Sequence, residues 1–223
     1  MLQKVLLLSG LASSLVYAAI NVFVPMTWDE YSITNQTVSE LSAIGAPTRA
    51  LWIGLVAPYI ILFAAFGWGV LKSAGANQWL RTTGWLILVY SVFNLYWPPM
   101  HQRDVLAAGG GTLTDTLHLV WAGVTVFLFV LIMAFGAIAS GRIFRVYTTL
   151  SAAALIVCGL LTALGAPNVG ANLPTPWIGV WERVNIGVFL LWVAVLSVSL
   201  VRLERDAGYS LHAFNIGKAK LSG

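Results

Sequence analysis

The sequence is poor in charge. Only 9% of its 223 residues are charged, whereas 59% are hydrophobic, and the mean hydropathy is +0.84. A soluble globular domain usually carries about 25% charged residues. This composition excludes an ordinary soluble fold and predicts an all-α integral membrane protein.

Metal-binding and disulfide-forming residues are equally scarce. The single cysteine, Cys158, excludes an internal disulfide and a thiolate metal cluster. There are three histidines, and no HExxH motif accompanies them. The pI of 9.4 could indicate nucleic-acid binding, but the basic residues lie at the ends of apolar runs, where they orient helices in a membrane. We therefore expect the lipid bilayer as a partner and no nucleic acid, while a protein partner is not indicated.

Long apolar runs dominate what is present. Six of them are long enough to cross a hydrocarbon core of roughly 30 Å, and they predict a six-transmembrane-helix bundle. They lie near 4–24, 51–72, 80–98, 114–139, 143–165 and 181–201. The first run continues past the small residues of a signal-peptide-like segment, so we predict an uncleaved helix. Residues 1–205 would form one transmembrane domain, and 206–223 a short cytoplasmic tail.

The basic residues predict the orientation. With the N-terminus inside, nine of the twelve Lys and Arg residues fall on the cytoplasmic side, which places both termini in the cytoplasm. These nine are Lys4, Lys72, Arg81, Arg142, Arg145, Arg202, Arg205, Lys218 and Lys220. The outer side keeps Arg49, Arg103 and Arg183, together with most of the acidic residues.

The outer loops, about 25–50, 99–113 and 166–180, are long and rich in Gly, Pro and Trp, whereas the inner turns are short. Long structured loops tend to carry function. In the first of them, Thr37 and Glu40 fit a capping box, and Gly45 and Pro47 form a stop signal. This pattern predicts a short interfacial helix, and Glu40 is either only its cap or part of a site.

Polar residues recur at helical spacing in the outer halves of the apolar runs. Because residues three or four apart share a helix face, each set should form a stripe, and costly lipid-facing polar groups favour stripes that face one another. The stripes contain Tyr17 and Asn21; Tyr90 and Asn94; Asp115, His118, Trp121 and Thr125; and Glu182 and Asn185. Two other roles remain open. Asp115 could serve only as a helix cap together with Thr112, and the asparagines could serve only to hold helices together.

Three kinds of site fit these residues. A zinc hydrolase would use His101, His118, Asp115 and Glu182 as ligands. A metal-free acid–base site would use His118 oriented by Asp115, with Ser39 as a distant nucleophile. A binding or transport pocket would recognise a polar or anionic ligand through Arg103 and Arg183. No cofactor is predicted, and zinc stands only as the alternative in the first of these.

Four short motifs occur in a characteristic order along the chain. They are Ser39-Glu40-Leu41-Ser42-Ala43-Ile44-Gly45-Ala46-Pro47, Pro99-Met100-His101-Gln102-Arg103, Asp115-Thr116-Leu117-His118 and Trp181-Glu182-Arg183. Together they resemble the bacterial multi-span membrane family catalogued as domain of unknown function 998, over roughly residues 5–201. The resemblance implies a multi-helix integral membrane protein and assigns no activity. We expect the protein in the cytoplasmic (inner) membrane.

A looser similarity is to the membrane hydrolases that include alkaline ceramidases and adiponectin receptors, which use Ser, Asp and His around zinc. This chain departs from them, because it has six predicted spans rather than seven and lacks the third histidine within the bundle. We therefore expect an uncharacterised multi-pass membrane protein with a polar small-molecule or lipid site that opens to the extracytoplasmic face.

The candidate ligand-binding residues are Ser39, Glu40, Asn94, His101, Arg103, Glu182, Asn185 and Arg183, and the candidate catalytic residues are Asp115 and His118. Whether the protein is an enzyme stays open. The alternatives are a membrane-embedded hydrolase acting on a lipid-like substrate and an accessory structural subunit. The second is suggested by the small residues between Gly54 and Gly69.

Overall fold

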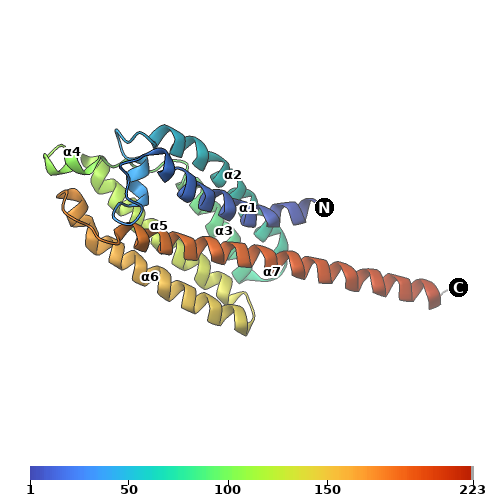
Figure 1. Ribbon diagram of the computed structural model, residues 1–223. Helices are drawn as coiled ribbons and strands as arrows, with labels where there is room; N and C mark the ends of the chain where they lie inside the picture. The colour runs from blue at the N-terminus through green and yellow to red at the C-terminus, as the bar shows by residue number, and fades with distance from the viewer. Residues whose placement is uncertain (222–223) are drawn as a thin grey trace.

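The computed structural model describes the backbone of residues 1–221 and the side chains of residues 1–206. Its regular structure is helical throughout this part of the chain (Figure 1). The α-helices are α1 (Leu2–Phe23), α2 (Arg49–Ser73), α3 (Gln78–Phe93), α4 (Arg103–Ala107), α5 (Leu113–Ile138), α6 (Arg142–Gly170) and α7 (Ile178–Leu221). Two short 3₁₀ helices, η1 (Pro25–Thr27) and η2 (Val38–Ser42), lie between α1 and α2.

The six long helices form a closed ring. Each packs against its neighbours in the order α1, α2, α3, α5, α6, α7 and back to α1. The connections 24–48, 94–112 and 171–177 gather at one end, the loop end, whereas the N-terminus and the short turns 74–77 and 139–141 lie at the other, the terminal end (Figure 1). α7 extends well beyond the ring at the terminal end.

Within residues 1–206, five helices are long and apolar enough to cross a membrane: α1, α2, α5, α6 and α7. The predicted third span, 80–98, is shorter than expected because α3 has only 16 residues and ends at Phe93. The pair Pro98-Pro99 follows closely, and residues before a proline avoid helical geometry. Conversely, α6 passes Pro167 and reaches Gly170, beyond the predicted end at residue 165.

The predicted tail, 206–223, does not begin at a break in the helix, since α7 continues to Leu221. Residues 222–223 lie outside the described part of the chain. Lys218 and Lys220, which are predicted to lie on the cytoplasmic side, fall outside the described side chains.

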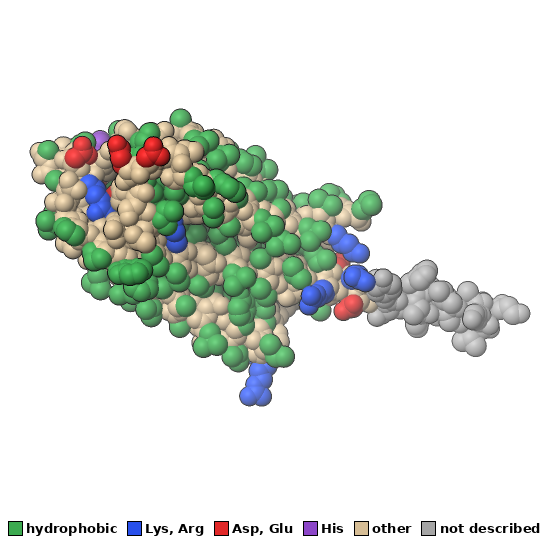
Figure 2. Space-filling model, viewed as in Figure 1, with side chains coloured by type: hydrophobic (Ala, Val, Ile, Leu, Met, Phe, Trp, Pro, Cys, Tyr) green, Lys and Arg blue, Asp and Glu red, His purple; other side chains and the backbone are tan. Residues whose placement is uncertain are grey.

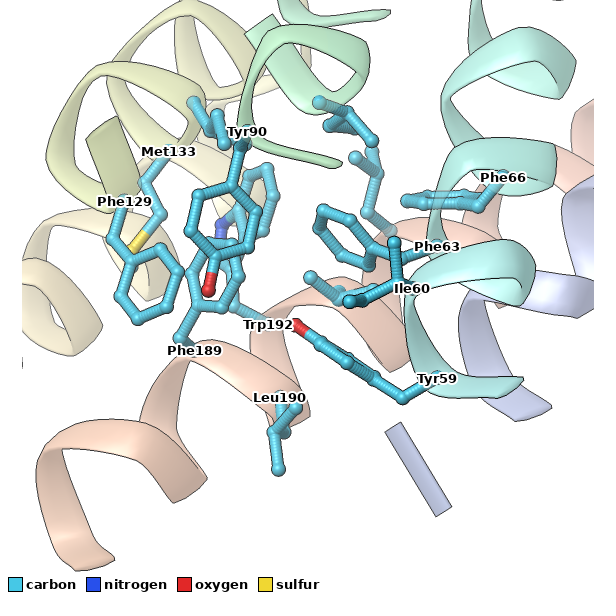
Figure 3. Close-up of a cluster of buried hydrophobic side chains, with 14 of the residues drawn as sticks. Tyr59, Ile60, Phe63, Phe66, Tyr90, Phe129, Met133, Phe189, Leu190 and Trp192 are labelled. Carbon is cyan, nitrogen blue, oxygen red and sulfur yellow. The ribbon is translucent and has the colours of Figure 1, made fainter. Parts of the chain in front are cut away.

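An aromatic layer forms the centre of the ring (Figure 3). Phe189 stacks on Phe129 with ring centroids 3.6 Å apart, and it also contacts Phe63, Tyr90 and Trp192. These rings come from α2, α3, α5 and α7, so the layer joins four helices. Phe189 and Trp192 are fully buried.

Two small residues of α2, Gly67 and Gly69, lie in close contact with other helices of the chain. A Cβ on Gly69 would lie 2.9 Å from the Leu6 carbonyl carbon of α1, and one on Gly67 would lie 2.8 Å from Ile87 of α3. Small residues let membrane helices approach closely in this way. Of this run, Gly54 has open space around it. Gly67 and Gly69 are therefore occupied within the chain, whereas Gly54 and Ala57 are exposed, so the accessory-subunit hypothesis keeps part of the feature that suggested it.

Replacing Gly69 with alanine should lower the free energy of unfolding by about 1–3 kcal/mol, because the added methyl group meets backbone that cannot move aside easily. The matched variant Gly54→Ala should be neutral or stabilising, since its Cβ meets nothing and alanine favours the helix. Unfolding in mixed micelles by SDS titration measures both. Equal stability of the two variants would contradict the α1–α2 contact described above.

Candidate ligand-binding cavity

The loop end is closed by residues 25–48, which an arginine of the next connection holds in place. Arg103 forms a two-pronged ion pair with Glu40, with Nε 2.6 Å from Oε1 and Nη2 2.9 Å from Oε2. Arg103 also donates to the Asn35 carbonyl and the Thr175 hydroxyl. One guanidinium thus joins all three connections of the loop end.

Glu40 is 2% exposed and also takes part in a helix cap. It accepts hydrogen bonds from the Thr37 backbone N–H (2.7 Å) and hydroxyl (2.9 Å), which completes the predicted capping box at the start of η2. The helix it caps is a single 3₁₀ segment of five residues. Glu40 therefore stabilises the loop and does not reach the cavity described below.

Arg183 holds the same loop from α7. Its guanidinium donates to the carbonyls of Ile33 and Gly179 and to the Tyr31 hydroxyl, over whose ring it also lies. Burial raises the pKa of the Tyr31 phenol above its ordinary value, so the hydroxyl keeps its proton and donates to the Thr37 carbonyl. Arg183, like Arg103, is thus engaged by the loop and does not line the cavity, which differs from the predicted role in recognising an anion.

Asp115 pairs with a different histidine from the one expected. Its carboxylate accepts from the His101 backbone N–H (2.6 Å) and lies 2.9 Å from His101 Nδ1, while it also caps α5 through Thr112. The nearby Ile44 N–H donates to the Met100 carbonyl. Asp115 therefore fastens the second connection to the first turn of α5.

His118 is buried and bonded elsewhere. Its Nδ1 lies 2.7 Å from the Pro98 carbonyl oxygen, which can only accept, so Nδ1 carries a hydrogen and donates it. The predicted orientation of His118 by Asp115 is thus replaced by a backbone contact. Asp115 and His118 lie on one face of α5 because they are three residues apart, but each contacts a residue of the second connection rather than the other side chain.

The four residues considered as zinc ligands form one pair, His101 with Asp115, rather than a group of four. Throughout residues 1–206, no three His, Cys, Asp or Glu side chains are close enough together to hold a metal ion. A structural or catalytic zinc site generally needs three or more protein ligands.

Below the loops lies a cavity of about 750 Å³ in the loop-end half of the ring. All six ring helices contribute to its walls, and η2 and the second connection roof it with Ser39, Ser42 and Met100. Phe129 and Phe189 of the aromatic layer form part of its floor (Figure 3). Cavities of roughly 300–1,000 Å³ are typical of small-molecule sites.

Glu182 is the distinctive polar group of this cavity. Its carboxylate accepts hydrogen bonds from the Val38 backbone N–H (2.5 Å) and the Ser39 hydroxyl (3.1 Å) of η2. Both donors are neutral, and among residues 1–206 no ion pair joins Glu182 to a basic side chain. An ionised carboxylate has about four acceptor positions, and these two hydrogen bonds do not fill them.

Further polar atoms are left without partners. Within the described side chains, Trp121 Nε1 and Thr125 Oγ1 on α5 are buried, line the cavity and make no hydrogen bond. Asn94 and Asn185 also line it, and each donates to a carbonyl, that of Tyr90 and that of Leu155 respectively. Buried polar groups are normally paired, so unpaired ones at a cavity indicate a missing partner.

The accessible side of the cavity is its flank rather than its roof. The lining residues that are themselves exposed lie on two helices only: Thr116, Leu119 and Gly123 of α5, and Ile156, Leu160 and Ala163 of α6. Among ring neighbours, α5 and α6 make the least extensive contact. At the loops, where the sequence predicts the opening, the lining residues are half-buried or buried.

Six predicted site residues therefore meet at the cavity: Ser39, Asn94, Asp115, His118, Glu182 and Asn185. Four others, Glu40, His101, Arg103 and Arg183, serve the loops above it. The predicted stripes included three aromatic lining residues, Tyr17, Tyr90 and Trp121, but not Trp52, Tyr59 or Trp97. Trp52 and Tyr59 lie seven positions apart on α2 and share a helix face, which could have indicated them together, but nothing local marks Trp97.

The distribution of side chains on the surface is typical of a membrane protein. Large hydrophobic side chains are exposed along the long helices, whereas charged side chains gather at the two ends: acidic ones beside basic ones at the loop end, and mainly basic ones at the terminal end (Figure 2). Together with the five long apolar helices, this defines a helical membrane protein. The chain belongs to the family described as "Protein of unknown function (DUF998)", which matches residues 11–199 and confirms the resemblance found in the motifs. No curated protein and no solved structure matches the chain.

Proposed function

We propose that this protein binds a lipid or a lipid-like amphiphile in the cavity between its helices. The carrying observation is the combination of an apolar, aromatic-walled space with unpaired buried polar atoms on one side of it. An amphiphile matches both parts, because its chain replaces apolar contacts and its head supplies the missing hydrogen bonds. The exposed lining residues on α5 and α6 support entry from the bilayer.

The membrane placement is part of this proposal. α3 supplies the remaining span; it has 16 residues and is followed at the loop end by the second connection. The excess of Lys and Arg at the terminal end supports a cytoplasmic location for that end and for both termini, in a bacterial inner membrane. The cavity would then lie in the outer leaflet.

A binding role fits the geometry better than hydrolysis. Ser39 donates its hydroxyl hydrogen to Glu182, whereas the described hydrogen bond of His118 goes to the Pro98 carbonyl. No described hydrogen bond joins His118 to Ser39 or Glu182, so these three residues make no nucleophile–base–acid relay in the described contacts. A binding site needs no such relay. It requires only that the cavity be open to its ligand.

Replacing Gly123 with leucine should lower lipid occupancy about tenfold, because filling a snug site typically costs 1–3 kcal/mol. Gly123 lines the cavity, is exposed and has no neighbour within reach of a Cβ, so the side chain has room to enter the opening without disturbing the fold. Native mass spectrometry of the protein purified from membranes measures the retained lipid.

The matched control is Gly187→Leu on α7, another exposed glycine with open space that does not line the cavity. Wild type and this control should retain the same amphiphile at the same occupancy. Equal occupancy in the Gly123 variant, or no retained lipid in any of the three, would refute the binding site.

A further inference from the structure

The charge of the cavity differs from that of the whole chain. The protein carries a net charge of +4, yet no Lys or Arg of the described side chains lines the cavity, whereas two carboxylates, Asp115 and Glu182, do. Asp115 is paired with His101. The basic residues nearest in the sequence to these acids have other partners in the loops: Arg103 binds Glu40, and Arg183 binds loop carbonyls.

Glu182 is thus an acid facing an apolar space with only neutral hydrogen-bond donors, Val38 N–H and the Ser39 hydroxyl. Neutral donors satisfy lone pairs but do not neutralise a charge, which is costly in a medium of low dielectric constant. A cationic group in the cavity would remove that cost. An anionic head would instead meet two carboxylates and no basic side chain.

Aromatic rings surround the same space. Eight of the residues that line the cavity carry phenyl, phenol or indole rings: Tyr17, Trp52, Tyr59, Tyr90, Trp97, Trp121, Phe129 and Phe189. Tyr17 packs against both Trp52 and Tyr59, with centroids 5.9 and 4.6 Å apart, so these rings form a continuous wall. Aromatic faces attract cations, and cages of such rings beside an acid suit ammonium groups.

From these observations we infer that the ligand is an ammonium-bearing amphiphile whose cationic head pairs with Glu182 among the aromatic rings and whose chain leaves between α5 and α6. This inference rests on the proposed lipid site and specifies its ligand class. The flank opening decides between a water-soluble cation and a membrane-dissolved one, since the exposed lining residues Leu119, Ile156 and Leu160 lie on apolar helices that are long enough to cross the bilayer. The roof, in contrast, is closed by the tightly bonded loop.

The test compares three single-chain probes that share one chain and differ only in the head: hexadecylamine, hexadecanol and palmitate. Each is added at low mole fraction to the full-length protein, stripped of lipid, in a neutral detergent at pH 7. Affinity is measured by displacement of a fluorescent alkylamine. Wild type should bind the amine at least about tenfold more tightly than the alcohol, and palmitate most weakly, since a desolvated cation contact is worth about this factor.

Two variants separate charge from structure. Glu182→Gln keeps an acceptor for Val38 and Ser39 but removes the charge, so it should bind amine and alcohol with similar affinity. Ser39→Ala removes a hydrogen bond to the same carboxylate but leaves its charge, so it should keep the preference for the amine.

The outcomes distinguish failure of the ammonium inference from failure of the lipid site. If wild type binds all three probes equally, or palmitate best, the ammonium inference is overturned and the lipid site stands. Retention of the amine preference by Glu182→Gln also overturns the inference. If no probe binds to wild type, the lipid site fails and the inference with it.

Discussion

Replacing Arg103 with methionine should lower the free energy of unfolding by about 3–5 kcal/mol, the usual cost of leaving one partner of a buried ion pair without the other. The side chains of Arg103 and Glu40 are 13% and 3% exposed, so the orphaned carboxylate has almost no access to water. The same change removes the bonds to Asn35 and Thr175 that join the three connections. SDS titration in mixed micelles measures the loss.

The control is a double variant. Glu40→Gln combined with Arg103→Met removes both charges and should recover a large part of the loss, because no unpaired charge remains. Arg81→Met, which removes an exposed arginine that donates to the Gly75 carbonyl at the terminal end, should change stability by less than about 1 kcal/mol. If the single and double variants lose the same stability, the ion pair does not hold the loop as described.

Truncating Phe189 to alanine should cost about 3–5 kcal/mol, the range for large aromatic residues in close-packed cores. Phe189 is fully buried and touches rings from α2, α3 and α5 as well as Trp192 on its own helix. Lipid chains are about as apolar as the interior of a membrane protein, so the loss of stability comes from lost packing contacts rather than from exposure to water. Thermal unfolding in detergent would report it as a lowered midpoint.

Leu191→Ala is the matched change, since Leu191 is the next residue but one on α7 and is 59% exposed. It should have little effect on the midpoint. Phe189→Leu should fall between, because leucine restores part of the volume. A loss from Leu191→Ala as large as that from Phe189→Ala would mean that the aromatic layer is not the packing centre of the ring.

Local sequence signals determined the parts of this protein that depend on near neighbours. Apolar runs marked the long helices because a membrane helix satisfies its own backbone. The two capping boxes, Thr37 with Glu40 and Thr112 with Asp115, were readable because both partners lie within one turn. The same signals overestimated α3 and underestimated α6, where the effects of Pro98 and Pro167 depended on what packs around them.

Only the tertiary structure decided which polar groups meet. Asp115 and His118 share a helix face, yet their partners, His101 and the Pro98 carbonyl, come from a connection whose path local sequence does not specify. Arg103 and Arg183 were predicted to recognise a ligand and instead bind the loops, so among residues 1–206 no ion pair joins a basic side chain to Glu182 at the cavity. The physical reason is that such pairings join residues up to about 150 positions apart, and their energies depend on burial and geometry that exist only once the ring has closed.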